Sequence, residues 1–251
     1  MADFTIQIAG RSVKVHSLFE STRDYCRSYL TEEVPEYDIT VSREDLAFEQ
    51  EAAIIEAKEE GLRIRIFPEP FLERAAIQRK LAEYLFDRNI LLLHGSTVAV
   101  DGQAYLFTAK CGTGKSTHTR LWRQVFGERA VMVNDDKPFL RLTPEGVLAC
   151  GSPWSGKHGL DTNITVPLKG ICVLERGPEP EIRRASPEEL LPMLLHQGYC
   201  PLDPARRPQY EALIATLANT VPLWHMACTK DPRSALTAYG AMSRQAVRTD
   251  F

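Results

Sequence analysis

The segment Ala-Lys-Cys-Gly-Thr-Gly-Lys-Ser-Thr, residues 109–117, constrains the fold more than any other part of the chain. It follows a strand pattern over residues 104–108 and precedes a helical pattern over residues 116–126. A glycine-rich turn in this context points its backbone N–H groups at one place, and the helix N-terminus adds the positive end of a dipole. The sequence therefore predicts a phosphate-binding P-loop within an α/β core.

The side chains of this segment match the parts of a nucleoside triphosphate site. Lys115 is predicted to neutralise the β- and γ-phosphates, and the Ser116 hydroxyl to ligate a metal ion. Ala109 stands where the motif usually has its first glycine, at the start of the loop. The predicted cofactors are ATP and Mg²⁺. The predicted nucleotide-binding residues are Cys111, Gly112, Thr113, Gly114, Lys115, Ser116 and Thr117.

The first third of the chain is expected to form a small α+β region, residues 1–85. Alternating apolar residues predict strands over 4–8, 11–15, 38–41 and 62–67, and helical spacing predicts a helix over 72–88. The glutamate-rich stretch 43–60 fits either a helix or an exposed connector.

Residues 86–251 are expected to form the α/β core. Short apolar runs predict strands over 90–93, 97–100, 104–108, 130–133, 171–174 and 223–227. Helical patterns cover 116–126, 188–195, 208–218 and the chain from 232 onward. The turn Asp101-Gly102 predicts a hairpin between two of these strands.

Two adjacent carboxylates, Asp135 and Asp136, end the strand that follows the P-loop helix. Neighbouring residues of a strand point to opposite faces, so the two are expected to do different work. One carboxylate is placed to hold the metal, and the other to accept a proton from an attacking hydroxyl.

The stretch 93–139 resembles the catalytic core of HPr kinase/phosphorylase. It carries Leu-His-Gly-Ser at its start, a hairpin, the P-loop, and Val-Asn-Asp-Asp-Lys toward its end, in the order of that family. The resemblance covers about a fifth of the chain, and the subclass includes ATP-dependent phosphoenolpyruvate carboxykinase and serine kinases of peptide precursors. It implies an HPr kinase/carboxykinase-type P-loop core with a mixed sheet.

The resemblance also implies roles for individual residues. Lys115 would bind phosphate, Ser116 would bind Mg²⁺, and His94 would be an active-site residue. Asp136 would accept the proton of a serine hydroxyl, with Asp135 nearer the metal. The predicted catalytic residues are therefore His94, Lys115 and Asp136, and the predicted metal ligands are Ser116 and Asp135.

The chain departs from that family at several places. The family's Glu-x-x-Gly metal-binding segment corresponds to residues 166–170, Val-Pro-Leu-Lys-Gly, which carry no acid. The catalytic arginine has no secure counterpart, and the HPr-specific N-terminal domain is not recognisable. We therefore expect a different phosphoryl acceptor, and the sequence does not predict the reverse phosphorylase reaction.

Other polar residues suggest secondary roles. The loop 151–159, with Trp154, Lys157 and His158, has the composition of a segment that closes over a substrate. Asn163 is a candidate for the missing metal contact. For three further features the ordinary interpretation is favoured: Cys111 as a small loop residue rather than a redox switch, His118 as a packing partner of Trp122, and Arg206-Arg207 as a solvated loop.

Composition narrows the class of protein. The net charge is −3 and no block of basic residues is present, so nucleic acid is not an expected partner. No signal peptide and no apolar run of about 18 residues is visible, which predicts a protein without a membrane partner. The six cysteines are scattered, as in reduced cytoplasmic proteins. The oligomeric state stays open, a homo-oligomer included.

The leading hypothesis is a Mg-ATP-dependent kinase that phosphorylates a hydroxyl, a serine of a peptide or protein. A small-molecule kinase or carboxykinase-like enzyme is a second interpretation. A non-catalytic ATP-sensing module is a third.

Overall fold

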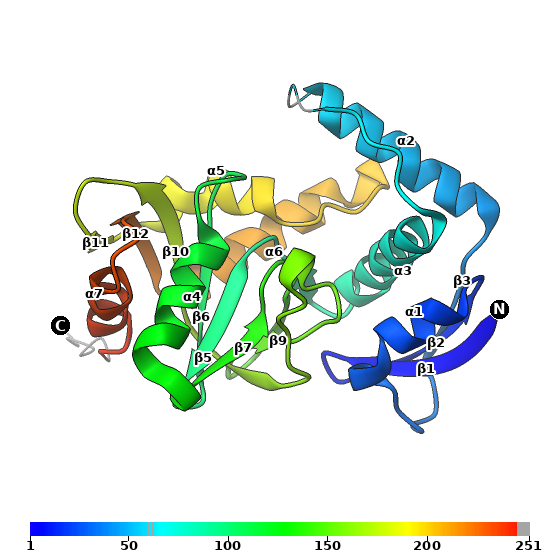
Figure 1. Cartoon of the computed structure of the whole chain (residues 1–251), viewed down its shortest axis with the longest axis horizontal. Coiled ribbons are helices and arrows are strands. Elements are labelled where there is room, and N and C mark those ends of the chain that lie inside the picture. Colours follow the sequence, from blue (N-terminus) through cyan, green and yellow to red (C-terminus); the bar gives the residue numbers. More distant parts are fainter. Residues whose placement is uncertain (60, 62, 245–251) are drawn as a thin grey trace. The chain divides into compact units, whose positions relative to one another are not determined.

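The computed structural model describes residues 1–59, 61 and 63–244. The chain divides into two compact units, Met1–Arg88 and Asn89–Phe251 (Figure 1), and each is described by itself. In the described part of the chain, no helix combines the length and the apolar composition needed to cross a bilayer.

The first unit contains a three-stranded sheet and three α-helices. Strands β1 (Ala2–Ile8) and β2 (Arg11–Ser17) pair antiparallel, and β3 (Tyr37–Thr40) pairs parallel to β2. Alternate residues of these strands are buried, as the period of two requires when one face is covered. The remaining elements are α1 (Glu20–Tyr25), the 3₁₀ turn η1 (Arg27–Tyr29), α2 (Arg43–Glu59) and α3 (Glu69–Phe86).

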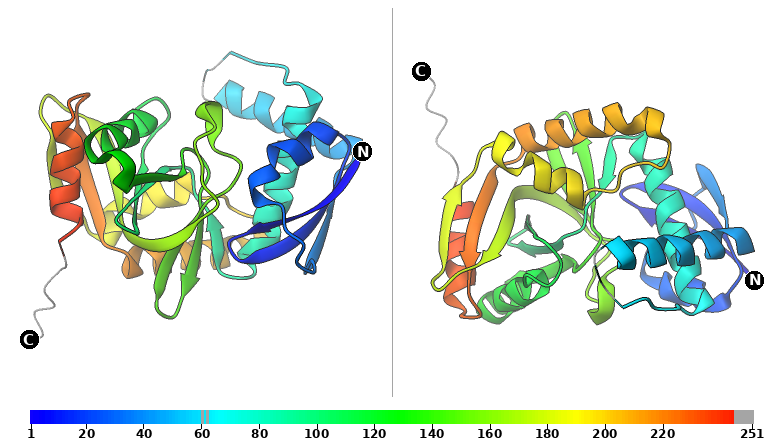
Figure 2. Two further views of the ribbon diagram at one scale, coloured as in Figure 1. Left: turned by 60° about the horizontal axis from the view of Figure 1, so that its bottom comes forward. Right: turned by 90° about the horizontal axis from the view of Figure 1, so that it is seen from above.

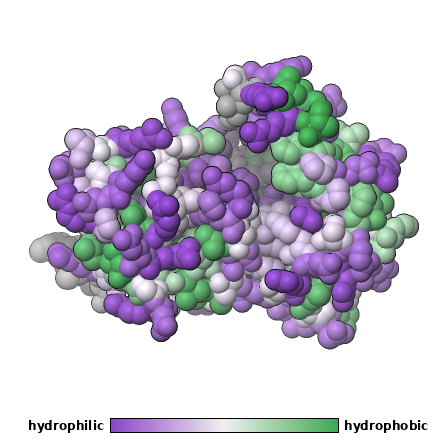
Figure 3. Space-filling model, in the orientation of Figure 1, coloured by the Kyte–Doolittle hydropathy of each residue, from purple (hydrophilic) through white to green (hydrophobic). Residues whose placement is uncertain are grey.

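The glutamate-rich stretch, for which the sequence left two interpretations open, forms helix α2 through Glu59. Leu46 is its one buried residue among those described, so apolar burial contributes little to holding it. Ion pairs supplement it, such as Asp45 Oδ1 to Arg79 Nη2 of α3 at 3.1 Å. Phe48 and Ile55 are 41% and 50% exposed, and Figure 3 shows hydrophobic residues at the surface around α2.

The strand predicted over residues 62–67 is wrong for residues 63–67, which form no strand; residue 62 lies outside the described residues. The Gln50 side chain supplies hydrogen bonds to the backbone of this stretch. It donates to the Arg65 carbonyl at 3.0 Å and accepts from the Phe67 N–H at 2.8 Å. Alternation describes which way side chains point, but a strand also needs a neighbouring strand to pair with.

The second unit is built on a mixed nine-stranded sheet. Seven strands run in the order β4-β8-β9-β10-β6-β5-β7, and β12 pairs with both β10 and β11. Their bounds are β4 Ile90–Leu92, β5 Ser96–Val100, β6 Gln103–Thr108, β7 Ala130–Asn134, β8 Phe139–Thr143, β9 Gly146–Cys150, β10 Thr165–Arg176, β11 Glu181–Arg184 and β12 Leu223–Cys228.

The long strand β10 joins the antiparallel and parallel parts of this sheet. Its first residues pair antiparallel with β9, and the register shifts between Leu168 and Gly170. Beyond that irregularity β10 pairs parallel with β6 on one side and with β12 on the other. The carboxyl ends of β6, β10 and β12 therefore lie at one edge of the sheet.

Helices cover both faces of the sheet. Helices α4 (Lys115–Phe126) and α7 (Arg233–Met242) lie on one face, and α5 (Pro187–Gln197) and α6 (Arg207–Thr220) lie on the other, as Figure 2 shows. Beneath α4, Trp122 is fully buried against Tyr105 and Phe107 of β6, with ring centroids 4.8 and 5.3 Å away. Such aromatic pairs contribute more than their buried area alone.

Most predicted elements are confirmed, and the mixed α/β class with them. The sequence patterns missed β8, β9, β11 and α1. Strands β8 and β9 form a hairpin whose alternation is weakened by small and charged residues. Strand β11, Glu-Ile-Arg-Arg, carries one apolar residue and takes its order from pairing with β12.

Glu73 of α3 provides a test of packing in the first unit. It is fully buried and accepts hydrogen bonds from the Leu18 N–H and the Thr22 hydroxyl. Glu73→Ala leaves the buried Thr22 hydroxyl and the half-buried Leu18 N–H without this acceptor, so we expect the free energy of unfolding of the first unit to fall by about 2–4 kcal/mol. Hydrogen exchange of the Leu18 amide in the full chain measures it.

The matched control is Glu56→Ala at an exposed position of α2. All three tryptophans lie in the second unit. Tryptophan fluorescence therefore measures the unfolding of that unit, whose stability should be the same in the variant and the unaltered protein. Unchanged protection of Leu18 in Glu73→Ala would contradict the structural role of this carboxylate.

Candidate active site

Strand β5 gathers the polar residues of the candidate site. It runs antiparallel to both β6 and β7, with Ser96 opposite Phe107 and Thr97 opposite Asn134. The start of β5 therefore lies beside the carboxyl ends of both neighbours. This register brings His94, the glycine-rich loop after β6 (residues 109–114) and the turn after β7 (residues 135–137) to one place.

His94 and Asp136 form a direct pair. His94 Nε2 lies 3.1 Å from Asp136 Oδ1, and both side chains are about one-third exposed, at 29% and 33%. The backbone supports the pair, because the Gly95 N–H donates to the Asp136 carbonyl at 3.0 Å and the Thr108 hydroxyl donates to the His94 carbonyl at 2.8 Å.

The pKa values of both His94 and Asp136 are lowered. Burial lowers the pKa of His94 below its usual value, assisted by the charges of Lys137 and Lys115 and opposed by Asp136. Burial by itself would raise the pKa of Asp136, but the His94 hydrogen bond and the charge of Lys137 outweigh it, and the net pKa is lowered. At neutral pH the site thus holds a neutral imidazole beside an ionised carboxylate.

Asp135 has a separate set of partners. It is 6% exposed, and its Oδ1 accepts from the Ser96 hydroxyl at 2.6 Å. Ser96 is in turn 2.7 Å from the Thr119 hydroxyl on α4. Since Thr119 and Ser116 are three residues apart on the helix, Asp135 is connected to the helix face that carries Ser116.

The glycine-rich loop adopts conformations that favour glycine. Gly112 and Gly114 have φ of 73° and 124°, and Gly114 directly precedes α4. Lys115 is 9% exposed, and its Nζ donates to the Ala109 carbonyl at 3.1 Å. Burial lowers the pKa of Lys115, opposed by the charges of Cys111, Asp136 and Asp135. Cys111 is exposed, whereas Thr113, Ser116 and Thr117 are half-buried.

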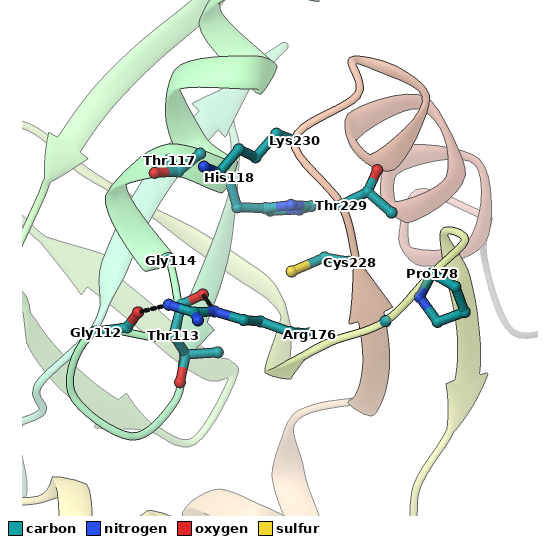
Figure 4. Close-up of a pocket in the computed structure, with 11 residues that line it drawn as sticks. Gly112, Thr113, Gly114, Thr117, His118, Arg176, Pro178, Cys228, Thr229 and Lys230 are labelled. Carbon is teal, nitrogen blue, oxygen red and sulfur yellow. Dashed lines mark hydrogen bonds between the residues drawn. The ribbon is translucent and has the colours of Figure 1, made fainter.

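An arginine outside the glycine-rich loop donates hydrogen bonds to two of its carbonyl groups (Figure 4). Arg176, the last residue of β10, donates from Nη2 to the Gly112 carbonyl at 2.6 Å and from Nε to the Thr113 carbonyl at 3.5 Å. Sequence patterns did not single out Arg176, since no motif marks it and only the parallel pairing of β10 with β6 brings it here.

The turn that carries both aspartates is organised by Asn134. Its side chain is fully buried, accepts from the N–H groups of Asp136 and Lys137 at 2.8 and 2.5 Å, and donates to the Ser152 carbonyl and hydroxyl at 2.7 and 3.0 Å. The sequence feature that could have identified Asn134 is Asn-Asp-Asp at a strand end, because asparagine side chains commonly hydrogen-bond the backbone of such turns.

The loop 151–159 divides into two parts. Trp154 is 7% exposed, whereas Lys157 and His158 are exposed in the short 3₁₀ turn η3 (Gly156–His158). Gly156 has φ of 67°, and a Cβ there would lie 3.2 Å from the Cβ of Asp136. The backbone of this loop at Gly156 therefore lies close to the Asp136 side chain. Trp154 is a buried core residue.

The remaining candidates have simpler surroundings. His118 Nε2 accepts from Trp122 Nε1 at 3.1 Å, which confirms its packing role. Arg207 pairs with Glu211 one turn on at 3.0 Å, and Asn163 is exposed. No cluster of three or more histidine, cysteine or acidic residues is arranged to bind a metal within the described ranges.

Comparisons with known proteins add little to this geometry. No family model matches the chain, and no curated protein matches it. Among solved structures, the Hpr(Ser) kinase/phosphatase from Coxiella burnetii is similar over 51% of this chain and 88% of its own, with 16% sequence identity and a TM-score of 0.29.

Replacing Asn134 should disrupt the aspartate turn. Asn134→Ala removes the acceptor of two backbone N–H groups and both bonds to Ser152, for an expected loss of about 2–4 kcal/mol. Chemical unfolding followed by tryptophan fluorescence reports the second unit. Asn219→Ala, at an exposed position of α6, is the matched control and should change stability by less than about 1 kcal/mol. Equal stability of the two variants would refute the role of Asn134.

His118 should make the second unit sensitive to acid. Burial lowers the pKa of His118 from 6.5 to about 3. Below pH 6.5 the unfolded chain takes up a proton at this position while the folded chain does not, so stability falls as the pH falls toward about 3. At about 1.4 kcal/mol per pH unit, the loss between pH 6.5 and 5 is about 2 kcal/mol.

The matched variant is His118→Gln, which keeps an acceptor for Trp122 and does not titrate. Free energies of unfolding by tryptophan fluorescence at several pH values should show a shallower decline for the variant. Parallel curves for the two proteins would contradict the expectation.

Proposed function

We propose that this protein is a Mg-ATP-dependent kinase that transfers the γ-phosphoryl group to a hydroxyl, a serine of a peptide or protein. The observation that carries the proposal is the His94–Asp136 pair at 3.1 Å, positioned by one strand register beside a glycine-rich loop and Lys115. A loop that only binds phosphate needs no paired carboxylate, whereas phosphoryl transfer from a hydroxyl needs a group that takes its proton.

Asp136 is the proposed proton acceptor. Its lowered pKa keeps it ionised at neutral pH, and neutral His94 donates from Nε2 to its Oδ1. This bond fixes the orientation of the carboxylate and leaves Oδ2 for the acceptor hydroxyl. Gly156, which approaches Asp136 through backbone, limits where an acceptor can enter.

Lys115 and the loop supply the positive potential for the phosphates. The ammonium group is held near the loop by the Ala109 carbonyl and keeps two further protons for phosphate oxygens. The backbone N–H groups at the start of α4 add partial positive charge.

The residues present fit a magnesium ion. Ser116 offers a hydroxyl, and Asp135 accepts one hydrogen bond, from Ser96, leaving carboxylate capacity for a cation. Magnesium in phosphate sites takes one or two protein oxygens and completes its shell with water and phosphate. When bound, it would neutralise charge developing on the phosphates.

The proposed transfer is a single displacement at the γ-phosphorus. The acceptor oxygen forms a bond to the γ-phosphorus while the bond from that phosphorus to the bridging oxygen breaks, releasing ADP. Asp136 takes the hydroxyl proton, and Lys115 stabilises the charge on the transferring group.

Asp136→Asn tests the proposal. Asparagine keeps the size of the side chain and an oxygen for the His94 bond but cannot take a proton. We expect transfer from labelled ATP to serine peptides to fall about 10²–10⁴-fold, with the Kd for Mg-ATP changed by less than about threefold. A parallel panel of hydroxylated metabolites separates peptide acceptors from small ones.

Asp101→Asn is the matched control. Asp101 is an exposed turn residue with φ of 52°, a conformation that asparagine tolerates, and it pairs with Arg129, the residue before β7. Full transfer activity in Asp136→Asn would exclude Asp136 as the proton acceptor, and binding of Mg-ATP without any transfer by the unaltered protein would favour a sensing module.

A further inference from the structure

Residues 63–67, Arg-Ile-Arg-Ile-Phe, lie in the connection between α2 and α3 and alternate cationic and apolar side chains. Figure 1 shows this connection as an uncoiled trace beside α2. Ile64 and Ile66 are 46% and 78% exposed, and Arg63 and Arg65 are exposed as well. Apolar side chains that stay in water gain little from folding. The packing of the first unit therefore does not explain the alternation.

The Gln50 side chain holds one edge of this segment in an extended conformation. Its amide bonds the Arg65 carbonyl through nitrogen and the Phe67 N–H through oxygen, at 3.0 and 2.8 Å. A residue of a neighbouring parallel strand makes the same two bonds, with its own N–H and C=O, to the residues on either side of its partner. The Gln50 amide thus stands where a strand neighbour of Ile66 would be.

The opposite edge of the segment carries free backbone groups. In an extended chain the N–H and C=O of successive residues point to alternate sides. The backbone groups of Ile64 and Ile66 therefore point away from Gln50, and they make no hydrogen bond within the described residues. An unpaired edge of this kind is a template for another extended chain.

The side chains of the segment determine which chain would fit. A peptide paired at this edge places one face beside Ile64 and Ile66 and its other face beside Arg63 and Arg65. Neither guanidinium has an ion-pair or hydrogen-bond partner in the part of the chain that the structure describes. Charge complementarity therefore favours a peptide that alternates apolar and acidic residues.

The exposed glutamates of α2 are turned away from this edge. At 3.6 residues per turn, each of them lies about 100° or more around the helix from Gln50. Three of them, Glu51, Glu56 and Glu59, line a separate groove on α2. An acidic peptide at residues 63–67 is therefore not placed against them.

A second copy of this chain fits the edge poorly. Antiparallel self-pairing through Ile64 and Ile66 sets Arg65 opposite Arg65, in a pair without hydrogen bonds, where side chains are closest. Like charges directly opposite each other destabilise a sheet. Parallel self-pairing through the same groups shifts the register by one residue and sets arginine beside isoleucine.

We infer that residues 63–67 are a docking edge for an extended peptide that alternates apolar and acidic residues. The peptide adds a strand at Ile64 and Ile66. Main-chain hydrogen bonds supply affinity, and the alternation supplies specificity. The inference does not rest on the proposed function, because the edge lies within the first unit and the residues assigned to phosphoryl transfer lie in the second.

Hydrogen exchange in the full chain tests the pairing. The probe is a short capped peptide that alternates valine and glutamate, added to saturation. We expect exchange of the Ile64 and Ile66 amides to slow at least about tenfold, and that of the Phe67 amide, already bonded to Gln50, to change less. Unchanged exchange of both isoleucine amides would overturn the inference.

Charge reversal tests the specificity. Fluorescence anisotropy compares the glutamate probe with a matched peptide that alternates valine and lysine. The unaltered protein should bind the glutamate probe at least about tenfold more tightly, and the double variant Arg63→Glu, Arg65→Glu should reverse this preference. The control is the double variant Arg23→Glu, Arg27→Glu, at exposed positions elsewhere in the first unit, which should keep the original preference.

A backbone variant separates main-chain pairing from side-chain contact. Ile66→Pro removes the N–H that faces the peptide, and its fixed φ suits an extended chain. We expect it to bind the glutamate probe at least about tenfold more weakly. Ile66→Ala keeps the N–H and should weaken binding by less than about fivefold, which corresponds to one cross-strand side-chain pair.

The remaining outcomes are also decisive. Equal Kd values for the two peptides, binding of neither, or equal effects of Ile66→Pro and Ile66→Ala would overturn the docking edge. A dimer of the unaltered protein that Ile66→Pro dissociates would assign the edge to a second copy and overturn it as well. Transfer by Asp136→Asn is measured at the second unit, so the proposed function can fail while the docking edge stands, and the reverse.

Discussion

The register of β5 between two antiparallel neighbours is the constraint on which the rest of the candidate site depends. Ser96 faces Phe107 on one side, and Thr97 faces Asn134 on the other. A slip by one residue would turn the side chains of β5 to the opposite face. Ser96 would then no longer reach Asp135, and His94 would leave Asp136.

Buried polar bonds reinforce this register. Asn134 closes the turn after β7, and Ser96 connects Asp135 to Thr119 of α4. Each of these side chains is fully or almost fully buried, so their partners cannot be replaced by water without cost. The result is two neighbouring carboxylates with different surroundings. One is held against a helix and the other against an imidazole.

Sequence patterns predicted the parts of this molecule whose order is local. The glycine-rich loop, the hairpin around Asp101-Gly102 and the strand before Asp135 follow from turn residues and apolar spacing within a few positions. The packing of His118 against Trp122 followed from a spacing of four on one helix. Residues 63–67 show the limit, because their alternation is that of a strand and no neighbouring strand pairs with them.

The features that the sequence did not predict depend on contacts between distant parts of the chain. Ser96 and Arg176 are ordinary residues in their local sequence, and only the sheet topology places them at the site. Strand β11 likewise takes its conformation from β12. No local pattern contains these partners, so the sequence predicts the aspartates and the loop but not the residues that position them.

The bonds from Arg176 to the glycine-rich loop have a thermodynamic consequence. In a trans peptide the C=O and the following N–H point in opposite directions, so a Thr113 carbonyl turned toward Arg176 turns the Gly114 N–H away from it. A loop fixed in this way is preorganised and has little conformational entropy left to lose when an anion arrives. Under the proposed function, a cation on the outer side of the loop would thereby favour the binding of phosphate on its inner side, without contacting the phosphate itself.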